Sequence, residues 1–177
     1  QLWSVNDLGV GVLVNTQRGR TSARRALPPG AFELRGELEP RYRFDSTAHL
    51  SVQIEALGLR IELAGDDALA LLITPLGGKR FAATWRREQR EDGEWRGVAD
   101  LDSFSSEVEL EEPLAFVVEW SGTRFDARCG TQDAPSATLA SALPGSEWGN
   151  SRAPEALEVY AERGVAVLTG WSLAVAP

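Results

Sequence analysis

The sequence predicts an all-β domain built as a two-sheet antiparallel sandwich. Apolar and polar residues alternate with a period of two along most of the chain, which is typical of strands with one buried face. Turn-forming combinations of Gly, Pro and Asp separate these runs at regular intervals. Segments with helical periodicity are scarce, so a parallel α/β fold is not expected.

The first half of the chain contains a series of alternating runs. Strands are expected over residues 10–14, 31–38, 49–55, 59–63 and 68–74. The run 31–38 alternates strictly and places Phe32, Leu34 and Leu38 on one face. Pro and Gly residues at 28–30 and 75–78 predict turns on either side of this region.

Two hairpins are expected in the second half. Asp92-Gly93 is a hairpin signal between predicted strands over 79–87 and 95–101. Ser121-Gly122 joins strands over 114–120 and 123–129. Residues 130–154 are rich in Ser, Ala, Pro and Gly and predict a long loop that could include a helical turn over 136–143. Strands over 156–161 and 165–175 close the chain. Alternation predicts that one face of each sheet packs inward and the other meets solvent.

Bulk composition limits the partners of the chain. Its 177 residues fit one domain, residues 1–177, with a sizeable core. The net charge of −8 and the pI of about 4.8 disfavour nucleic acid and anionic membrane surfaces. No apolar run approaches the roughly 20 residues that a membrane-spanning helix needs, so membrane insertion is not expected.

Single residues exclude several kinds of site. The one cysteine, Cys129, excludes an internal disulfide and a thiolate metal centre, and is expected to be a buried structural thiol. His49 is the one histidine, which excludes a His-rich metal centre. The chain starts at Gln1 and contains no methionine. This predicts a processed or excised chain that works outside the cytoplasm, as an extracytoplasmic or secreted protein.

Three segments resemble concanavalin A-like (laminin-G-like) domains of the bacterial DUF1080 type. Residues 27–34 (LPPGAFEL) resemble the early strand of that family, residues 116–125 (FVVEWSGTRF) a central hairpin, and residues 156–167 (ALEVYAERGVAV) the closing hairpin. The resemblance implies a jelly-roll sandwich that binds carbohydrates or proteins, and some such domains are hydrolases. The Asn-Ser-Gly segment of many DUF1080 domains is replaced by residues 45–48 (DSTA), so the sugar chemistry of that family is not implied.

The weak catalytic candidates are Glu107, Glu109 and Glu111. On a strand, alternate residues face the same way about 6.6 Å apart, and retaining glycosidases need two carboxyls about 5–5.5 Å apart. The run also resembles the Glu-x-Asp-x-Glu pattern of sandwich-fold glucanases, with glutamate at the middle position. The favoured alternative is a solvated acidic strand that prevents edge-to-edge pairing.

Aromatic residues are the candidates for ligand contact. Of six tryptophans, Trp120 and Trp171 lie in apolar runs and are expected in the core. Trp95 and Trp148 are expected to contact a ligand, together with the polar residues Asp92 and Asn150.

No cofactor is expected, and calcium is the one metal left open. Possible donors are Asp66, Asp67, Asp92, Asp100 and Asp102, although turn chemistry explains the turn aspartates without a metal.

A basic segment could meet an acidic partner or another part of the parent protein, and a solvated strand face is the favoured alternative. It contains Arg18, Arg20, Arg24 and Arg25. Asp45, Ser46 and His49 are too close in sequence to form a nucleophile triad.

The leading hypothesis is therefore a non-catalytic module that recognises a glycan or a protein partner within a larger bacterial protein. The alternatives are a glycoside hydrolase-like enzyme using Glu107, Glu109 and Glu111, and a purely structural or regulatory interaction domain. The sequence leaves the oligomeric state open.

Overall fold

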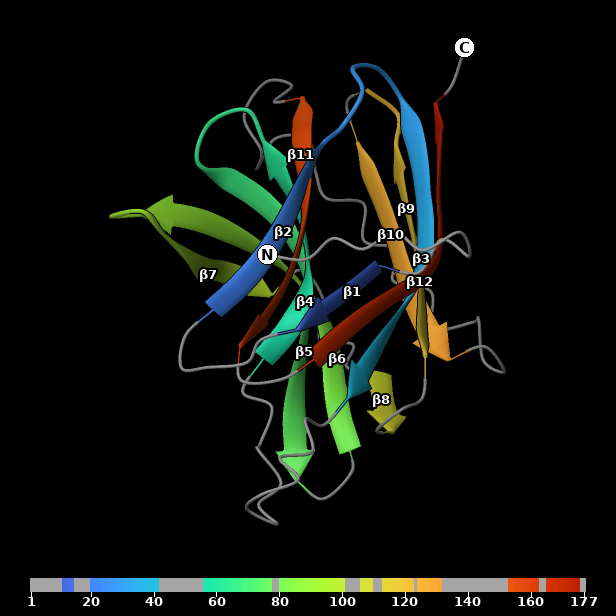
Figure 1. Cartoon of the computed structure of the whole chain (residues 1–177). Helices are drawn as coiled ribbons and strands as arrows, with labels where there is room; N and C mark the ends of the chain where they lie inside the picture. The colour runs from blue at the N-terminus through green and yellow to red at the C-terminus, as the bar shows by residue number, and fades with distance from the viewer. Residues whose placement is uncertain are drawn as a thin grey trace.

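The computed structural model describes residues 11–14, 20–41, 56–77, 80–100, 106–109, 113–122, 124–131, 153–162 and 165–175. These residues form twelve β-strands and no helix, arranged in two facing antiparallel sheets (Figure 1). The described part of the chain therefore holds no helix that could cross a membrane. The all-β, two-sheet jelly-roll prediction is confirmed.

The strands are numbered in the order in which they occur along the chain. They are β1 (Gly11–Val14), β2 (Arg20–Ala26), β3 (Phe32–Arg41), β4 (Ala56–Leu63), β5 (Asp67–Gly77), β6 (Arg80–Glu91), β7 (Glu94–Asp100), β8 (Ser106–Glu109), β9 (Leu114–Trp120), β10 (Phe125–Thr131), β11 (Pro154–Glu162) and β12 (Val165–Val175).

The five-stranded sheet has the order β1-β12-β3-β9-β10. The seven-stranded sheet has the order β2-β11-β4-β5-β6-β7, and β8 also pairs with β6. The last two strands lie beside the first ones, but they do not form the hydrogen-bonded closing hairpin that the resemblance implies. Strand β11 pairs with β2 and β4, whereas β12 pairs with β1 and β3 in the other sheet. The closing segment thus joins the two layers (Figure 1).

The hydrophobic core fills the space between the sheets. In the five-stranded sheet, β9 alternates strictly between buried and half-buried positions, as the sequence predicts. Leu34 of β3 lies beside Val118 of β9, and both are fully buried. The Trp120 and Phe125 rings pack with their centroids 4.6 Å apart. Trp171 packs against the core from a half-buried position.

The seven-stranded sheet departs from the predicted alternation, because its central strands are buried on both faces. Leu57, Leu59 and Ile61 of β4 face the core, but Arg60 and Glu62 on the opposite face are also buried. The prediction that this second face meets solvent is wrong for β4 and β11. The charged side chains on this face form ion pairs with one another, so their charges are compensated without water.

Several boundaries also differ from the sequence prediction. Apolar alternation does not predict β2 as a separate strand, because three of its seven residues are arginines and only two, Ala23 and Ala26, are apolar. Strand β5 continues through Pro75 to Gly77, where the sequence predicts a turn, and its register shifts there. A bulge lets a proline sit in a strand without a missing ladder hydrogen bond. The strand predicted over 49–55, the loop over 130–154 and its helical turn lie outside the described residues.

Gly58 should tolerate no side chain, because β4 and β5 approach closely there. A Cβ added at Gly58 would lie 2.0 Å from the carbonyl oxygen of Leu71. We expect Gly58→Ala to lower the free energy of unfolding by about 1–3 kcal/mol, since backbone must move to make room. Urea unfolding measures this. Gly97→Ala is the matched control, because its Cβ would meet only the flexible side chain of Arg86, at 3.3 Å. Equal effects of the two substitutions would contradict the prediction.

Cys129 should be unreactive in the folded protein. It is a free, buried thiol, and burial raises its pKa to about 12, while the indole of Trp85 opposes that shift only in part. We expect slow reaction with a thiol reagent at pH 8–9 and fast reaction in urea, because the thiolate is the nucleophile. Stability should fall as the pH rises from about 9 towards 12, since the unfolded thiol ionises first. Fast labelling of Cys129 in the native protein would contradict the prediction that this thiol is buried and unreactive.

Candidate ligand-binding face

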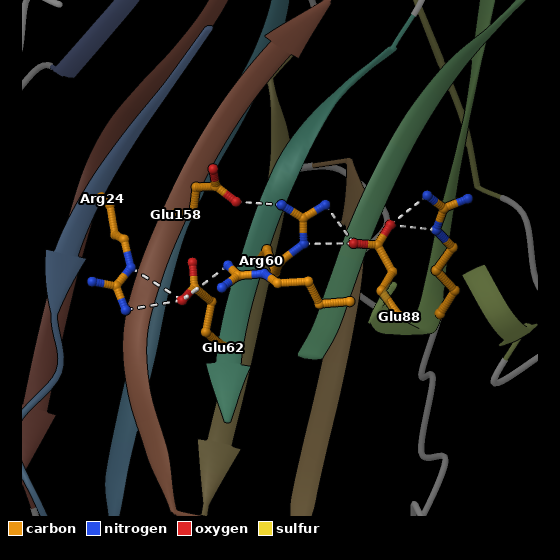
Figure 2. Close-up of polar contacts among 7 residues, drawn as sticks. Arg24, Arg60, Glu62, Glu88 and Glu158 are labelled. Atoms are coloured by element: carbon orange, nitrogen blue, oxygen red, sulfur yellow. Dashed lines mark hydrogen bonds and ion pairs between the residues drawn. The ribbon is translucent and has the colours of Figure 1, made fainter. Parts of the chain in front are cut away.

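The candidate site lies on the outer face of the seven-stranded sheet, the face turned away from the core. Register pairs connect Arg24 of β2 to Glu158 of β11, Glu158 to Arg60 of β4, and Arg60 through Ala70 of β5 to Arg86 of β6. Because directly opposed residues point to the same side of a sheet, these side chains form one line across five strands. We call this line the charged row; Figure 2 shows its members and their neighbours.

Arg60 is the centre of the charged row and is only 1% exposed. Its guanidinium donates hydrogen bonds to Glu88 of β6 and Glu158 of β11 (Figure 2). It also lies 4.8 Å from the ring centroid of Trp95 and 4.7 Å from that of Tyr160. Two carboxylates and two aromatic rings thus compensate one buried cation.

Glu88 joins the centre of the row to its β6 end. Its side chain is fully buried, and it accepts a hydrogen bond from the Arg86 Nε at 2.7 Å in addition to those from Arg60. One carboxylate therefore holds two guanidinium groups in place.

Glu62 of β4 holds Arg24, at the β2 end of the row, in the same way. Its Oε2 accepts hydrogen bonds from the Arg24 Nε at 3.1 Å and Nη2 at 2.9 Å (Figure 2). Arg90 adds an ion pair at 3.9 Å. The hydrogen bond to Glu62 is the main cause that raises the pKa of Arg24. Arg24 therefore pairs with an acidic residue of its own chain, and Arg25 lies over the Trp171 ring at 4.9 Å.

The β6–β7 hairpin brings Trp95 over the charged row. Asp92 and Gly93 both have positive φ, 52° and 83°, the backbone that a two-residue hairpin turn requires. Trp95 then pairs with Arg90 across the hairpin, and the Arg90 guanidinium lies 4.5 Å from its ring centroid. The indole is half-buried between two arginines from different strands.

Burial separates the two signs of charge on this face. The carboxylates of Glu62, Glu88 and Glu158 have exposed side-chain fractions of 8%, 0% and 11%. The side chains of Arg24, Arg86 and Arg90 are 56%, 25% and 41% exposed. In these ion pairs the arginines therefore face solvent, whereas the carboxylates are covered.

The sequence-predicted ligand contacts have mixed positions. Trp95 belongs to the candidate site, and Asp92 lies exposed at the hairpin turn, where its backbone shapes the turn. Trp148 and Asn150 lie outside the described residues and stay predictions.

The catalytic candidates are placed only in part. Backbone pairing sets Glu107 of β8 beside Ala82 and Glu109 beside Arg80. Their side chains, and the whole of Glu111, lie outside what the structure describes. The structure therefore leaves the catalytic hypothesis untested.

Sequence reasoning missed Arg60, Glu62, Glu88, Glu158 and Arg86. The available signal was a charged residue at alternate positions of strongly apolar runs, as at Arg60 and Glu62 between leucines and isoleucine. Alternation alone gives such residues a solvent-facing role, and only the strand order shows that opposite charges meet.

Calcium has no assembled site among the described residues, where no three His, Cys, Asp or Glu side chains come together as metal ligands would. Asp67 is buried and forms an ion pair with Arg87 at 2.8 Å. Asp66 lies in the turn between β4 and β5, as turn chemistry predicts. Asp100 ends β7, and Asp102 lies outside the described residues.

A hollow of about 380 Å³ lies beside the five-stranded sheet and is a second candidate site. Its lining is mainly apolar and includes Phe32, Trp120 and Val175, together with Glu33. Glu33 is held by Arg35, whose guanidinium lowers the pKa of that carboxyl. The described residues that line the hollow include no arginine, in contrast to the face of the other sheet.

No family model matches the chain, and no curated protein is significantly similar to it. Among solved structures it resembles an alginate lyase from Klebsiella pneumoniae, with a TM-score of 0.56, 10% identity, and coverage of 84% of this chain and 61% of the lyase. It also resembles a xylan beta-1,4-xylosidase from Bacillus halodurans C-125, with a TM-score of 0.56, 11% identity, and coverage of 94% of this chain and 33% of the xylosidase. The chain thus spans less than two thirds of either protein.

These likenesses and the strand order show that the chain has the fold of a jelly-roll β-sandwich. At this identity they show the fold alone. The narrower DUF1080-type relationship stays a prediction from sequence.

Glu88 should be essential for stability. Glu88→Ala leaves Arg60 buried with one carboxylate fewer, so we expect the free energy of unfolding to fall by about 3–5 kcal/mol. Urea unfolding followed by tryptophan fluorescence measures the change. Glu33→Ala is the control, because its ion pair with Arg35 is exposed and should contribute about 0–1 kcal/mol. If Glu88→Ala lowered the free energy of unfolding by less than Glu33→Ala does, Glu88 would not stabilise the charged row.

Proposed function

We propose that this chain is a non-catalytic glycan-binding module and that its ligand binds over the charged row. One observation carries the proposal: exposed guanidinium groups and a half-buried indole converge on one face. The part of the Trp95 indole that the two arginines leave exposed offers an apolar surface to a sugar. Arginine offers several donors in a fixed fork for sugar oxygens.

The groups of this face are held before any ligand arrives. Arg24, Arg86 and Arg90 stand on strands, and each is paired with a buried carboxylate. Side chains fixed in this way lose little conformational entropy on binding. Such preorganisation is what a binding face built on rigid elements requires.

The two similar structures are named for enzymes that process polysaccharides. They support a fold that can carry a saccharide site, and a fold does not define a function. The arrangement of side chains on the charged row supports the proposal independently of them.

A glycan array, run in calcium and in EDTA, tests the proposal. We expect selective binding that Trp95→Ala weakens on the order of tenfold or more and that Trp95→Phe partly retains. Val98→Ala is the matched control, because Val98 is exposed on the same hairpin and lies beside the β7 bulge. Trp148→Ala tests the second predicted aromatic contact. Loss of binding in EDTA would show that the site includes a calcium ion.

Absence of binding to any glycan would overturn the proposal. The same arginines and indole are the residue types that dominate protein interfaces. That result would therefore favour a protein ligand at this face.

A further inference from the structure

We infer that the ligand of this face is an anionic glycan, a saccharide chain with carboxylate or sulfate groups that bind Arg24, Arg86 and Arg90. This inference rests on the proposed function and adds the chemical class of the ligand. The shared chemistry is an oxyanion received by a guanidinium fork.

Burial separates the two signs of charge in these ion pairs. A neutral sugar presents hydroxyl groups, which need acceptors as well as donors in the site. The carboxylates of the ion pairs, Glu62, Glu88 and Glu158, are covered and already engaged by arginine. The exposed partners in these pairs are arginines, which match an anion.

The local charge differs from that of the chain as a whole. Four arginines (Arg24, Arg60, Arg86 and Arg90) are balanced by four carboxylates (Glu62, Glu88, Glu158 and the exposed Glu155). The whole chain carries −8. A balanced patch with its arginines outward repels an anion less than the rest of an acidic surface does.

The exposed cations are widely spaced along the row. Arg24 and Arg86 stand at its two ends, four strand intervals apart. At about 4.8 Å for each interval, their strands are roughly 19 Å apart. A single sugar cannot reach both, so the ligand is an extended oligosaccharide that runs across the strands.

Glu155 provides a variant that is expected to strengthen ligand binding, whereas the arginine variants weaken it. It is exposed and its charge contributes to raising the pKa of Arg24. An anionic ligand bound at Arg24 would be repelled by this carboxylate. Removing the charge should therefore strengthen binding.

The experiment is calorimetry with two matched pairs of probes. One pair is an oligogalacturonate long enough to span the row and the same oligomer with its carboxylates methyl-esterified. The other pair is a dextran sulfate oligomer and plain dextran of equal length. We expect at least one charged member to bind on the order of tenfold or more tightly than its neutral partner, with affinity falling as salt rises.

The variants locate the contact. Arg24→Gln and Arg86→Gln should each weaken the charged probe several-fold, Arg24→Lys should restore part of the loss, and Glu155→Gln should strengthen binding. Arg35→Gln on the other sheet is the control, because it is exposed and outside the charged row. Thermal unfolding of each variant confirms that it is folded.

The outcomes separate the two proposals. Trp95-dependent binding of neutral glycans with no preference for charge would overturn this inference and leave the proposed function intact. Single-stranded DNA of equal length that binds as tightly as the charged glycans would also overturn it. No glycan binding of any kind would overturn both.

Discussion

The buried guanidinium of Arg60 is the interaction on which the seven-stranded sheet depends. A cation that is 1% exposed must be neutralised where it lies, since burying an unpaired charge costs several kcal/mol. Glu158 and Glu88 supply that charge from β11 and β6, and Trp95 and Tyr160 supply two rings. A slip of one residue in β4 would carry Arg60 into the core and its leucines out of it. The same contact therefore fixes the register of the sheet.

The rest of the outer face follows from this constraint. The β6–β7 hairpin must turn tightly enough for Trp95 to reach Arg60, and the positive φ of Asp92 and Gly93 makes that turn. Gly58 lets β5 approach the centre of the sheet. With Arg60 held, Glu88 has an oxygen left for Arg86. The result is a rigid face on which carboxylates lie inside and arginines point outward.

The proposed function rests on this face rather than on the fold. A jelly-roll sandwich hosts many activities, and similarity to a lyase and a xylosidase at 10–11% identity shows only the sandwich. The five-stranded sheet carries exposed ion pairs such as that of Glu33 and Arg35, which contribute little and orient little. The charged row differs because buried carboxylates orient its exposed arginines. That difference gives the two sheets different capacities for binding a ligand.

Most of the strands, several core positions and the buried thiol are predictable from the amino-acid sequence. Strict alternation identifies the core positions Leu34 and Leu38, Asp92-Gly93 marks the hairpin, and a lone Cys129 at the end of a strand run indicates a buried thiol. The packed structure is needed to show that β11 and β12 enter different sheets, and that Arg60 meets Glu88 and Glu158, 28 and 98 residues away. A period of two assigns each side chain to a face, whereas the partner across the sheet depends on strand order. Strand order is a property of the packed chain as a whole.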